Sequence, residues 1–275
     1  MTPIKPRLHV LLASRARIGL VIRRGPSRRV CTMLWDRDRD EFRLGQWLKG
    51  RIYERRSDLS PDGEHFLYFA MNGRAASETG GSWTAISRAP YLKAIALFAK
   101  GDCWNGGGLF TGSDQYWLND GPGHTTLRDS GELRRDRKYR PPSLGNNECL
   151  GVYYPRLLRD GWGLVSESRI TDDQKIDIFE KPAWDGWILR KLAHSGSPKA
   201  NGKGCYWDEH ELAHPALPRP IARPDWEWAE VDGERIVWAE GGKLLAATLG
   251  NEGPNEATVL FDFDGMSFQS IEAPY

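Results

Sequence analysis

The feature that most constrains the fold is a recurring Asp-Gly pair placed between two short apolar segments. The pair occurs in residues 57–70, 153–166 and 226–239. Asp and Gly both tolerate the positive φ angles of a tight two-residue turn, so this pattern is the strongest short-range indication of a β-hairpin. A chain that repeats the pattern is expected to be rich in antiparallel strands.

Weaker hairpin patterns lie at 8–22 and 107–119, and each of the five candidate hairpins precedes a second pair of strand-like segments. These second pairs are expected at 30–47, 83–97, 125–139, 175–192 and 244–268. The segment 91–100 is the best helix candidate, although its short apolar run also fits a buried strand. Two hairpins make a four-stranded antiparallel unit, and repeats of about 40–50 residues with four strands are typical of a β-propeller. We therefore predict an all-β fold, with residues 1–275 forming a single β-propeller domain of about five four-stranded blades.

The regular spacing fails between the hairpins centred near 160 and 232. Residues 195–223 are rich in Pro and Gly, and each proline removes a backbone donor that a strand would need. We interpret 195–223 as an inserted loop. The alternative is a degenerate sixth blade within the same stretch.

The segment Leu-Ser-Pro-Asp-Gly-Glu-His-Phe-Leu-Tyr-Phe-Ala at 59–70 resembles the Ser-Pro-Asp-Gly hairpin of TolB-like and WD-repeat-like propellers. In those proteins the four residues form the turn between inner strands of a blade. The resemblance implies the propeller fold. It implies no particular activity, because propellers include binding scaffolds, lectins, hydrolases and transport factors.

Charge is distributed unevenly along the chain, although the formal net charge is only +1. Residues 1–150 carry 25 basic and 16 acidic groups (+9), and residues 151–275 carry 13 and 21 (−8). The acids Asp36, Asp38, Asp40 and Glu41 interrupt the Arg-rich first quarter, which argues against a nucleic-acid partner. No apolar run has the ~20 residues that span a bilayer, and the four cysteines form no CxxC pair. We expect a cytoplasmic protein without a membrane partner.

One short motif predicts metal chemistry. His210-Glu211-Leu212-Ala213-His214 matches the HExxH pattern of the zincin metalloproteases. On a helix both imidazoles would share a face and bind Zn²⁺, while Glu211 polarised a metal-bound water as the catalytic base. Pro215 follows at once and does not favour a helix, so a loop cluster that adds Cys205 and Asp208 is the alternative. Zinc is therefore the one cofactor that the sequence suggests, and a chance spacing in a polar insert is the competing explanation.

Carboxylates and tryptophans supply the other candidate residues. Asp36 and Asp120 are expected at strand ends, where paired carboxylates of a central cavity could perform glycoside hydrolysis. Trp117 and Trp207 are candidate binding platforms for a protein partner or a small ligand. The competing explanations are turn formation for the aspartates and packing between blades for the tryptophans.

These observations favour a non-enzymatic binding or scaffold protein that uses one face of a β-propeller. The alternative is a hydrolase, either metal-dependent through 210–214 or glycoside-type through carboxylates in the central cavity.

Overall fold

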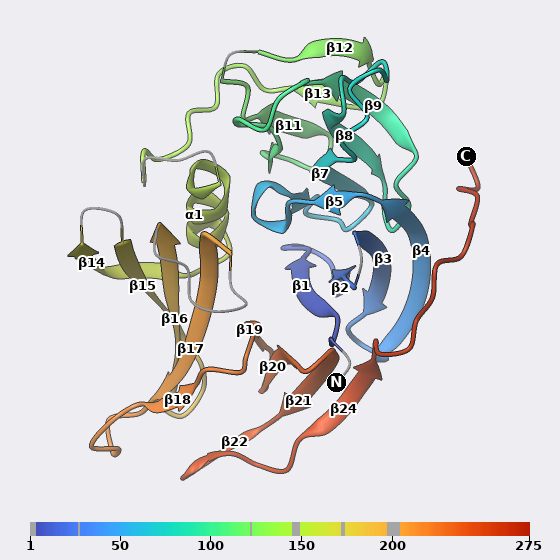
Figure 1. Ribbon diagram of the computed structural model, residues 1–275. Helices are drawn as coiled ribbons and strands as arrows, with labels where there is room; N and C mark the ends of the chain where they lie inside the picture. The colour runs from blue at the N-terminus through green and yellow to red at the C-terminus, as the bar shows by residue number, and fades with distance from the viewer. Residues whose placement is uncertain (1–3, 27, 122, 145–148, 172–173, 197–203) are drawn as a thin grey trace. The chain divides into compact units, whose positions relative to one another are not determined.

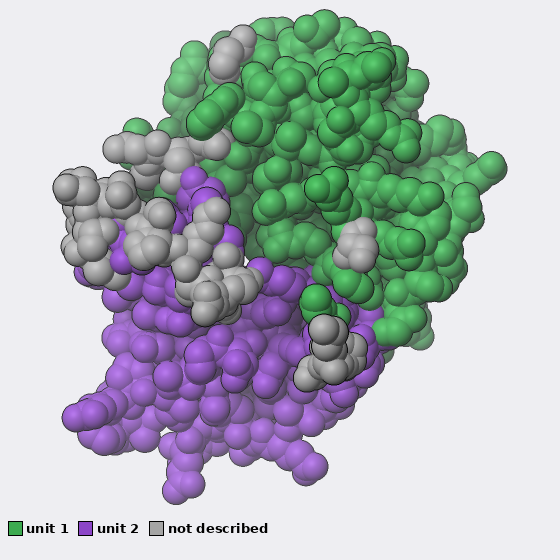
Figure 2. Space-filling view, viewed as in Figure 1, with its two compact units in different colours: residues 1–4, 9–156, 265–275 green, residues 5–8, 157–264 purple. Residues whose placement is uncertain are grey.

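The computed structural model describes residues 4–26, 28–121, 123–144, 149–171, 174–196 and 204–275 (Figure 1). Within these residues the fold is all-β, with several antiparallel sheets and one α-helix. The chain divides into two compact units, which Figure 2 colours separately. Unit 1 comprises residues 1–4, 9–156 and 265–275, and unit 2 comprises residues 5–8 and 157–264.

The first sheet of unit 1 is a four-stranded antiparallel meander in chain order. Its strands are β1 (Arg7–Leu12), β2 (Ile18–Arg24), β3 (Arg29–Asp36) and β4 (Glu41–Lys49). The β3–β4 turn is built by Asp36, whose Oδ1 accepts hydrogen bonds from the backbone N–H of Asp38 (3.0 Å) and Arg39 (3.3 Å). Because β4 pairs only with β3 within this sheet, β4 is an edge strand.

The second sheet of unit 1 has the order β12-β9-β8-β7-β5, with β6 also paired to β7. Its strands are β5 (Arg51–Ile52), β6 (Asp58–Leu59), β7 (His65–Met71), β8 (Ser82–Arg88), β9 (Ala94–Ala99) and β12 (Thr125–Arg128), and a short 3-10 turn, η1 (Glu54–Arg56), lies between β5 and β6. A small third sheet contains β10 (Gly108–Phe110), β11 (Gln115–Leu118) and β13 (Arg134–Arg135), and β13 is parallel to β11.

Strand β7 forms the centre of unit 1, because both of its faces are buried. Phe66 and Tyr68 belong to one apolar cluster, which also contains Leu20 of β2. Leu67, on the opposite face of the strand, belongs to a second cluster with Phe110 of β10. Side chains alternate across a strand, so a continuous apolar run such as Phe-Leu-Tyr-Phe-Ala is expected where both faces are covered.

Unit 2 consists of two main antiparallel sheets and one short ladder. The five-stranded sheet runs in chain order through β14 (Gly163–Thr171), β15 (Gln174–Pro182), β16 (Ile188–Gly196), β17 (Tyr206–Ala213) and β18 (Ile221–Arg223). The four-stranded sheet contains β19 (Trp228–Asp232), β20 (Arg235–Glu240), β21 (Lys243–Ala247) and β24 (Thr258–Asp262), and the ladder pairs β22 (Leu249–Gly250) with β23 (Gly253–Pro254).

Two of the three predicted Asp-Gly hairpins are confirmed, as β6–β7 and β19–β20. The segment 91–100 is a strand, β9, rather than a helix. The predicted second strand pair at 125–139 does not form a hairpin, because β12 pairs with β9 and β13 pairs with β11.

The hairpin predicted at 153–166 is wrong, because α1 (Leu150–Arg159) occupies its first half. The Asp-Gly pair ends this helix: Gly161 has φ +88°, its N–H donates to the carbonyl of Leu158, and the N–H of Trp162 donates to that of Leu157. These two bonds form a Schellman motif, for which Gly is the preferred residue just beyond the helix. The same dipeptide therefore served as a helix stop and not as a hairpin turn.

The inserted loop predicted at 195–223 is also wrong where the structure describes it. Tyr206–Ala213 is the strand β17, and Ile221–Arg223 is the strand β18. Asp208, His210 and Leu212 are buried in alternation along β17, which is the period of a strand. The prolines 215, 218 and 220 lie in the connection between the two strands, so they do not interrupt either one. Residue 198 lies outside the described residues.

Among the residues that the structure describes, no helix combines the length and the apolar character needed to cross a bilayer.

Candidate functional site

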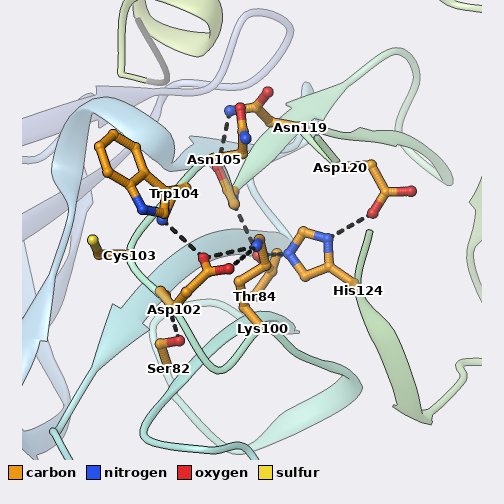
Figure 3. A network of polar contacts seen from close by, with 12 residues as sticks. Ser82, Thr84, Lys100, Asp102, Cys103, Trp104, Asn105, Asn119, Asp120 and His124 are labelled. Carbon is orange, nitrogen blue, oxygen red and sulfur yellow. Dashed lines mark hydrogen bonds and ion pairs between the residues drawn. The ribbon is translucent and has the colours of Figure 1, made fainter. Parts of the chain in front are cut away.

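A buried lysine organises the loop that follows β9 in unit 1 (Figure 3). The side chain of Lys100 is only 1% exposed, and its Nζ lies 2.7 and 2.8 Å from the two carboxylate oxygens of Asp102. The same carboxylate accepts a hydrogen bond of 2.9 Å from the backbone N–H of Trp104. Lys100 and Asp102 thus fix the first turn of the loop 100–107, which we call the Trp104 loop.

The backbone carbonyls of the Trp104 loop also accept hydrogen bonds from side chains of neighbouring elements. Ser82 Oγ donates to the carbonyl oxygen of Asp102 at 2.6 Å. The guanidinium of Arg56, a buried residue of η1, donates to the carbonyl of Cys103 at 2.8 Å and also to that of Asn105. Asn105 itself adopts a positive φ of 55°. The conformation of this short loop is therefore fixed by buried side chains of neighbouring elements.

Trp104 is the residue that the loop presents to solvent. Its side chain is 61% exposed, and within the described part of the chain its indole makes no hydrogen bond or ring contact. In Figure 3 the indole lies apart from the network that holds its backbone. A large aromatic side chain in such a position leaves an apolar surface in water on a rigid support.

A second part of the network joins β8 to the segment after β11. Thr84 Oγ1 accepts the backbone N–H of Gly107 at 2.8 Å and lies 2.9 Å from His124 Nε2. His124 Nδ1 lies 2.7 Å from Asp120 Oδ1, and the other carboxylate oxygen of Asp120 pairs with Arg135. A neutral imidazole satisfies every contact if Nδ1–H donates to Asp120 and Nε2 accepts the hydroxyl proton of Thr84.

The titration behaviour of this network agrees with a neutral imidazole. Burial lowers the pKa of His124 below its usual 6.5, against the opposing influence of the Asp120 carboxylate. Partial burial alone would raise the pKa of Asp120, but the hydrogen bonds from His124 and Arg135 outweigh it and hold that pKa below the usual 3.8. The pKa of Asp102 is also lowered, because the hydrogen bonds from Lys100 and the Trp104 N–H outweigh the effect of burial.

The order hydroxyl, imidazole, carboxylate is also that of a hydrolytic relay, but its position in unit 1 does not suit a substrate. Thr84 is 0% exposed, and its oxygen already accepts the Gly107 N–H. The side chain of His124 is also fully buried. A nucleophile must approach the reacting atom within about 3–3.5 Å. Because Thr84 and His124 are buried, a substrate does not reach them at that distance. What the relay does is to fix Gly107, the last residue of the Trp104 loop, to β8.

Three of the predicted binding residues lie in unit 1. Asp120 belongs to the network described above. Trp117, on β11, has its ring 5.8 Å from that of Tyr139 and is half-buried. Asp36 has the role given by its competing explanation, because its carboxylate builds the β3–β4 turn. The structure brings none of these three together as a pair of carboxylates around a shared cavity.

The predicted metal ligands and Glu211 lie on or beside β17 in unit 2. The helix that the HExxH geometry requires is absent, because 206–213 is a strand. His210 is buried, with Nδ1 2.9 Å from the carbonyl oxygen of Trp226 and Nε2 2.9 Å from Lys191 Nζ. Its Nδ1 must donate and its Nε2 must accept, so neither nitrogen offers a lone pair to a metal in this arrangement.

His214 has equally committed ring nitrogens. Its Nε2 lies 2.9 Å from the carbonyl oxygen of Asp185, and its Nδ1 accepts the N–H of Ala216 at 3.2 Å. Cys205 is exposed, and Glu211 lies on the face of β17 opposite His210. Throughout the described residues, no three or more His, Cys, Asp or Glu side chains form a group that could hold a metal ion. Zinc binding stays a prediction without structural support.

Trp207, the last predicted platform, is covered on one face by its own sheet. Its ring stacks on that of His194 with centroids 3.6 Å apart and planes inclined by only 6°. This stack lies within one sheet, between β16 and β17, and is not packing between blades.

Sequence reasoning missed Lys100, Asp102, Thr84 and His124, and it did not single out Trp104 among the tryptophans. Lys100 and Asp102 are close in sequence, but the contacts that tie them and His124 to β8 join residues 20 and 40 positions apart, and no local spacing encodes such contacts. One indication was available: Trp104 stands in Gly-Asp-Cys-Trp-Asn-Gly-Gly-Gly, and a tryptophan within a glycine-rich polar stretch is poorly placed for a core.

No protein-family model matches the chain, and no curated protein matches its sequence well enough to count as a relative. The functional assignment therefore depends on the geometry of the chain itself.

Proposed function

We propose that this protein is a non-enzymatic binding protein that engages a partner protein through Trp104. The observation that carries the proposal is a tryptophan that is 61% exposed on a loop whose backbone is held by Arg56 and by the Lys100–Asp102 pair. Tryptophan is among the residues most enriched at energetic hot spots of protein interfaces. A loop already fixed in its bound conformation loses little conformational entropy when a partner docks.

The surroundings of Trp104 favour a protein pocket over a polyhydroxyl or ionic ligand. The carboxylate of Asp102 is already bonded to Lys100 and to a backbone N–H, and that of Asp120 is bonded to His124 and Arg135. A sugar or a charged ligand needs polar groups that are still available for hydrogen bonding. The feature on offer is the apolar indole face, which an apolar pocket of a partner would desolvate.

A hydrolase is supported less well by the same residues. The Thr84–His124–Asp120 relay has the atom order of a hydrolytic site but is buried, and both imidazoles of 210–214 have their nitrogens engaged. The partner-binding proposal requires none of these groups to change its contacts.

The finer fold proposal is a β-propeller whose blades are the antiparallel meanders. Its support is the repeated up-and-down order of four or five strands in β1–β4, β14–β18 and β19–β24. An experimental structure tests it: sheets arranged around one common axis are expected, and sheets stacked as a sandwich would contradict it.

Photo-crosslinking at natural cysteines tests the binding proposal. Cys103, next to Trp104, and Cys205, in unit 2, are exposed, whereas Cys31 and Cys149 are buried. A benzophenone maleimide is attached at Cys103 in a Cys205→Ser protein, and at Cys205 in the matched Cys103→Ser protein. Each protein is irradiated in an extract of the source cells, and the crosslinked proteins are identified by mass spectrometry.

We expect one protein to be crosslinked from Cys103, not from Cys205, and to be lost when Trp104→Ala is added to the Cys103-labelled protein. The same set of crosslinked proteins from both cysteines, or a set unchanged by Trp104→Ala, would contradict a role for Trp104. The crosslinked protein is then purified for direct titration, which is the decisive measurement.

A further inference from the structure

The segment Gly265–Tyr275 of unit 1 forms no strand or helix, yet it is held along the surface of the unit. Figure 1 shows it in red, running beside the edge strand β4. It is anchored at three separate places. The carbonyl of Met266 accepts from Arg23 at 3.4 Å, the carbonyl of Ile271 accepts from Gln46, and the hydroxyl of Tyr275 bonds to the backbone at the end of β8 and just before β9.

The central anchor is a hydrogen bond to the main chain of the segment and not to a side chain. Gln46 Nε2 donates to the carbonyl oxygen of Ile271 at 2.7 Å. Its amide oxygen accepts the backbone N–H groups of Leu92 at 2.7 Å and Lys93 at 3.0 Å, so the orientation of the amide is fixed. A fixed amide that donates to a backbone carbonyl can hold any extended peptide that has a carbonyl at that place.

Two aromatic side chains of the segment, Phe268 and Tyr275, also contact unit 1, and we call their two places of contact the first and the second aromatic seat. Phe268 lies with its ring 6.0 Å from that of Trp47, and Lys49 Nζ is 5.0 Å from the Phe268 ring centroid. The ring of Tyr275 has two cationic side chains near it, with Arg88 Cζ 5.2 Å and Lys93 Nζ 5.4 Å from the ring centroid. At each of the two aromatic seats a cationic side chain lies near an aromatic ring, and the electrons of the ring face attract such a cation.

The hydroxyl of Tyr275 also makes two hydrogen bonds to the main chain of unit 1. It accepts the backbone N–H of Arg88 at 3.0 Å and donates to the carbonyl of Lys93 at 2.7 Å. A tyrosine fits both contacts, whereas a phenylalanine fits neither. The second seat therefore selects more strictly than the first.

The attachment of the segment is shallow. From 266 to 275 no residue is buried, and within the described residues no backbone-to-backbone hydrogen bond joins the segment to β4. A groove of about 760 Å³ also remains beside it, lined by Trp47, Tyr68, Trp83 and Leu97 together with Ile271. Trp47 is 9% exposed, and its indole N–H has no hydrogen-bond partner among the described residues. The surface could therefore make more contacts than this segment provides.

We propose that this surface is a recognition site for an extended peptide of a partner protein with two aromatic side chains seven positions apart, the second a tyrosine, and that Gly265–Tyr275 occupies this site in the isolated chain. The occupant we favour is a peptide because the structure already holds one there, through main-chain contacts at Met266 and Ile271 and side-chain contacts of two aromatic residues. The inference does not depend on Trp104, and the peptide is expected to bind Trp104→Ala protein unchanged.

The experiment compares the full chain with a chain that ends at Gly265. A fluorescein-labelled peptide of residues 266–275 is titrated against both proteins by fluorescence anisotropy, with near-UV circular dichroism as the folding check. The shortened protein should bind with a Kd on the order of 1–100 μM, which is usual for short extended peptides. The full chain should bind at least tenfold more weakly, because its own segment competes. Peptides with Phe268→Ala or Tyr275→Phe are the matched controls and should also lose about tenfold.

A random decapeptide library selected on the shortened protein then defines the partner. We expect enrichment of an aromatic residue followed seven positions later by tyrosine, on the shortened protein and not on the full chain. Equal binding of the 266–275 peptide to both proteins, or enriched peptides without the aromatic pair, would overturn the proposal. If the full chain forms dimers by light scattering and the shortened chain is monomeric, the occupant is the segment of a second copy, and the proposal is also overturned. If the shortened chain does not fold, the full chain with Phe268→Ser and Tyr275→Ser replaces it, with the same expected results.

Discussion

Thr84 satisfies two buried groups with one hydroxyl, and this makes it a sensitive residue of unit 1. Its oxygen accepts the Gly107 N–H, and its proton is available to His124 Nε2. Thr84→Val keeps the shape of the side chain but leaves a buried donor and a buried acceptor without partners. We expect the free energy of unfolding to fall by about 1–3 kcal/mol, measured by urea denaturation. Thr126→Val, at an exposed position of β12, should change it by less than about 0.5 kcal/mol. Equal midpoints for the two variants would show that the Thr84 contacts contribute nothing.

His124 predicts a pH dependence of stability in a defined window. Burial lowers its pKa in the folded protein, whereas the unfolded chain titrates near the usual 6.5. Between these two values the unfolded state binds more protons, so stability is full above about 6.5 and falls as the pH falls toward the folded-state pKa. The slope is at most about 1.4 kcal/mol per pH unit for one such group.

Urea titrations of wild type and His124→Gln between pH 7.5 and 5 test this dependence. The wild type should lose stability more steeply than the variant over this range. Asp120 and Asp102 do not obscure the result, because their lowered pKa values place their contribution near and below 3.8. Parallel profiles for the two proteins would mean that His124 titrates normally in the folded state.

How far a site can be predicted from a sequence is illustrated by Asp120. Its position after a strand and close to Trp117 indicated a polar site, and it does belong to the network around the Trp104 loop. Its actual partners, His124 and Arg135, have no spacing that announces them, and Thr84 lies 40 positions from His124. For the motif at 210–214 the sequence was misleading. Its spacing makes the two histidines neighbours only in a helix, and hydrogen bonding to β16 makes residues 206–213 a strand. Local pattern cannot decide between these states when tertiary pairing does.

At the scale of elements, the three Asp-Gly pairs show what local sequence can and cannot specify. All three require a glycine with positive φ, and the structure has it at Gly63, Gly161 and Gly233. Two of the pairs turn between strands, and one ends α1. The dipeptide therefore predicts the backbone conformation reliably, whereas the elements on either side depend on whether the flanking apolar residues bury with period 2 or 3.6.

The two hairpin glycines are expected to differ in their tolerance of substitution. At Gly233, with φ +64°, a Cβ would meet no atom within 4 Å, so Gly233→Val should cost only the strain of the left-handed backbone, about 1–2 kcal/mol. At Gly63, with φ +80°, a Cβ would also lie 2.8 Å from the Cβ of Ile18, and Gly63→Val should cost clearly more. Thermal unfolding of both variants measures the difference. An equal loss, or a larger loss for Gly233→Val, would contradict the packing of this turn on β2.

At the scale of the whole molecule, composition and hairpin patterns were sufficient to predict an all-β chain of antiparallel meanders. The patterns could not show that unit 2 holds a five-stranded sheet, because the prolines near β17 concealed its strand character. They also could not show which tryptophan would be exposed. Trp35 and Trp104 are both aromatic residues near acidic neighbours, yet the first is fully buried and the second is 61% exposed. The difference is that Trp35 lies in the strand β3, where its ring stacks on that of Phe42, whereas Trp104 lies in a loop.

The central claim is that the protein binds a partner through Trp104, which unit 1 presents on a loop held by buried side chains. Isothermal titration calorimetry with the purified crosslinked partner tests it most directly, with wild type, Trp104→Ala and Val165→Ala. Val165 is the matched control, because it is an apolar side chain that is 55% exposed in unit 2. Truncation of a central hot-spot aromatic costs at least about 2 kcal/mol, so the Kd of Trp104→Ala should rise at least about 30-fold. Val165→Ala should change the Kd less than about twofold, and all three proteins should melt at the same temperature. A Kd for Trp104→Ala within twofold of the wild-type value would contradict the account.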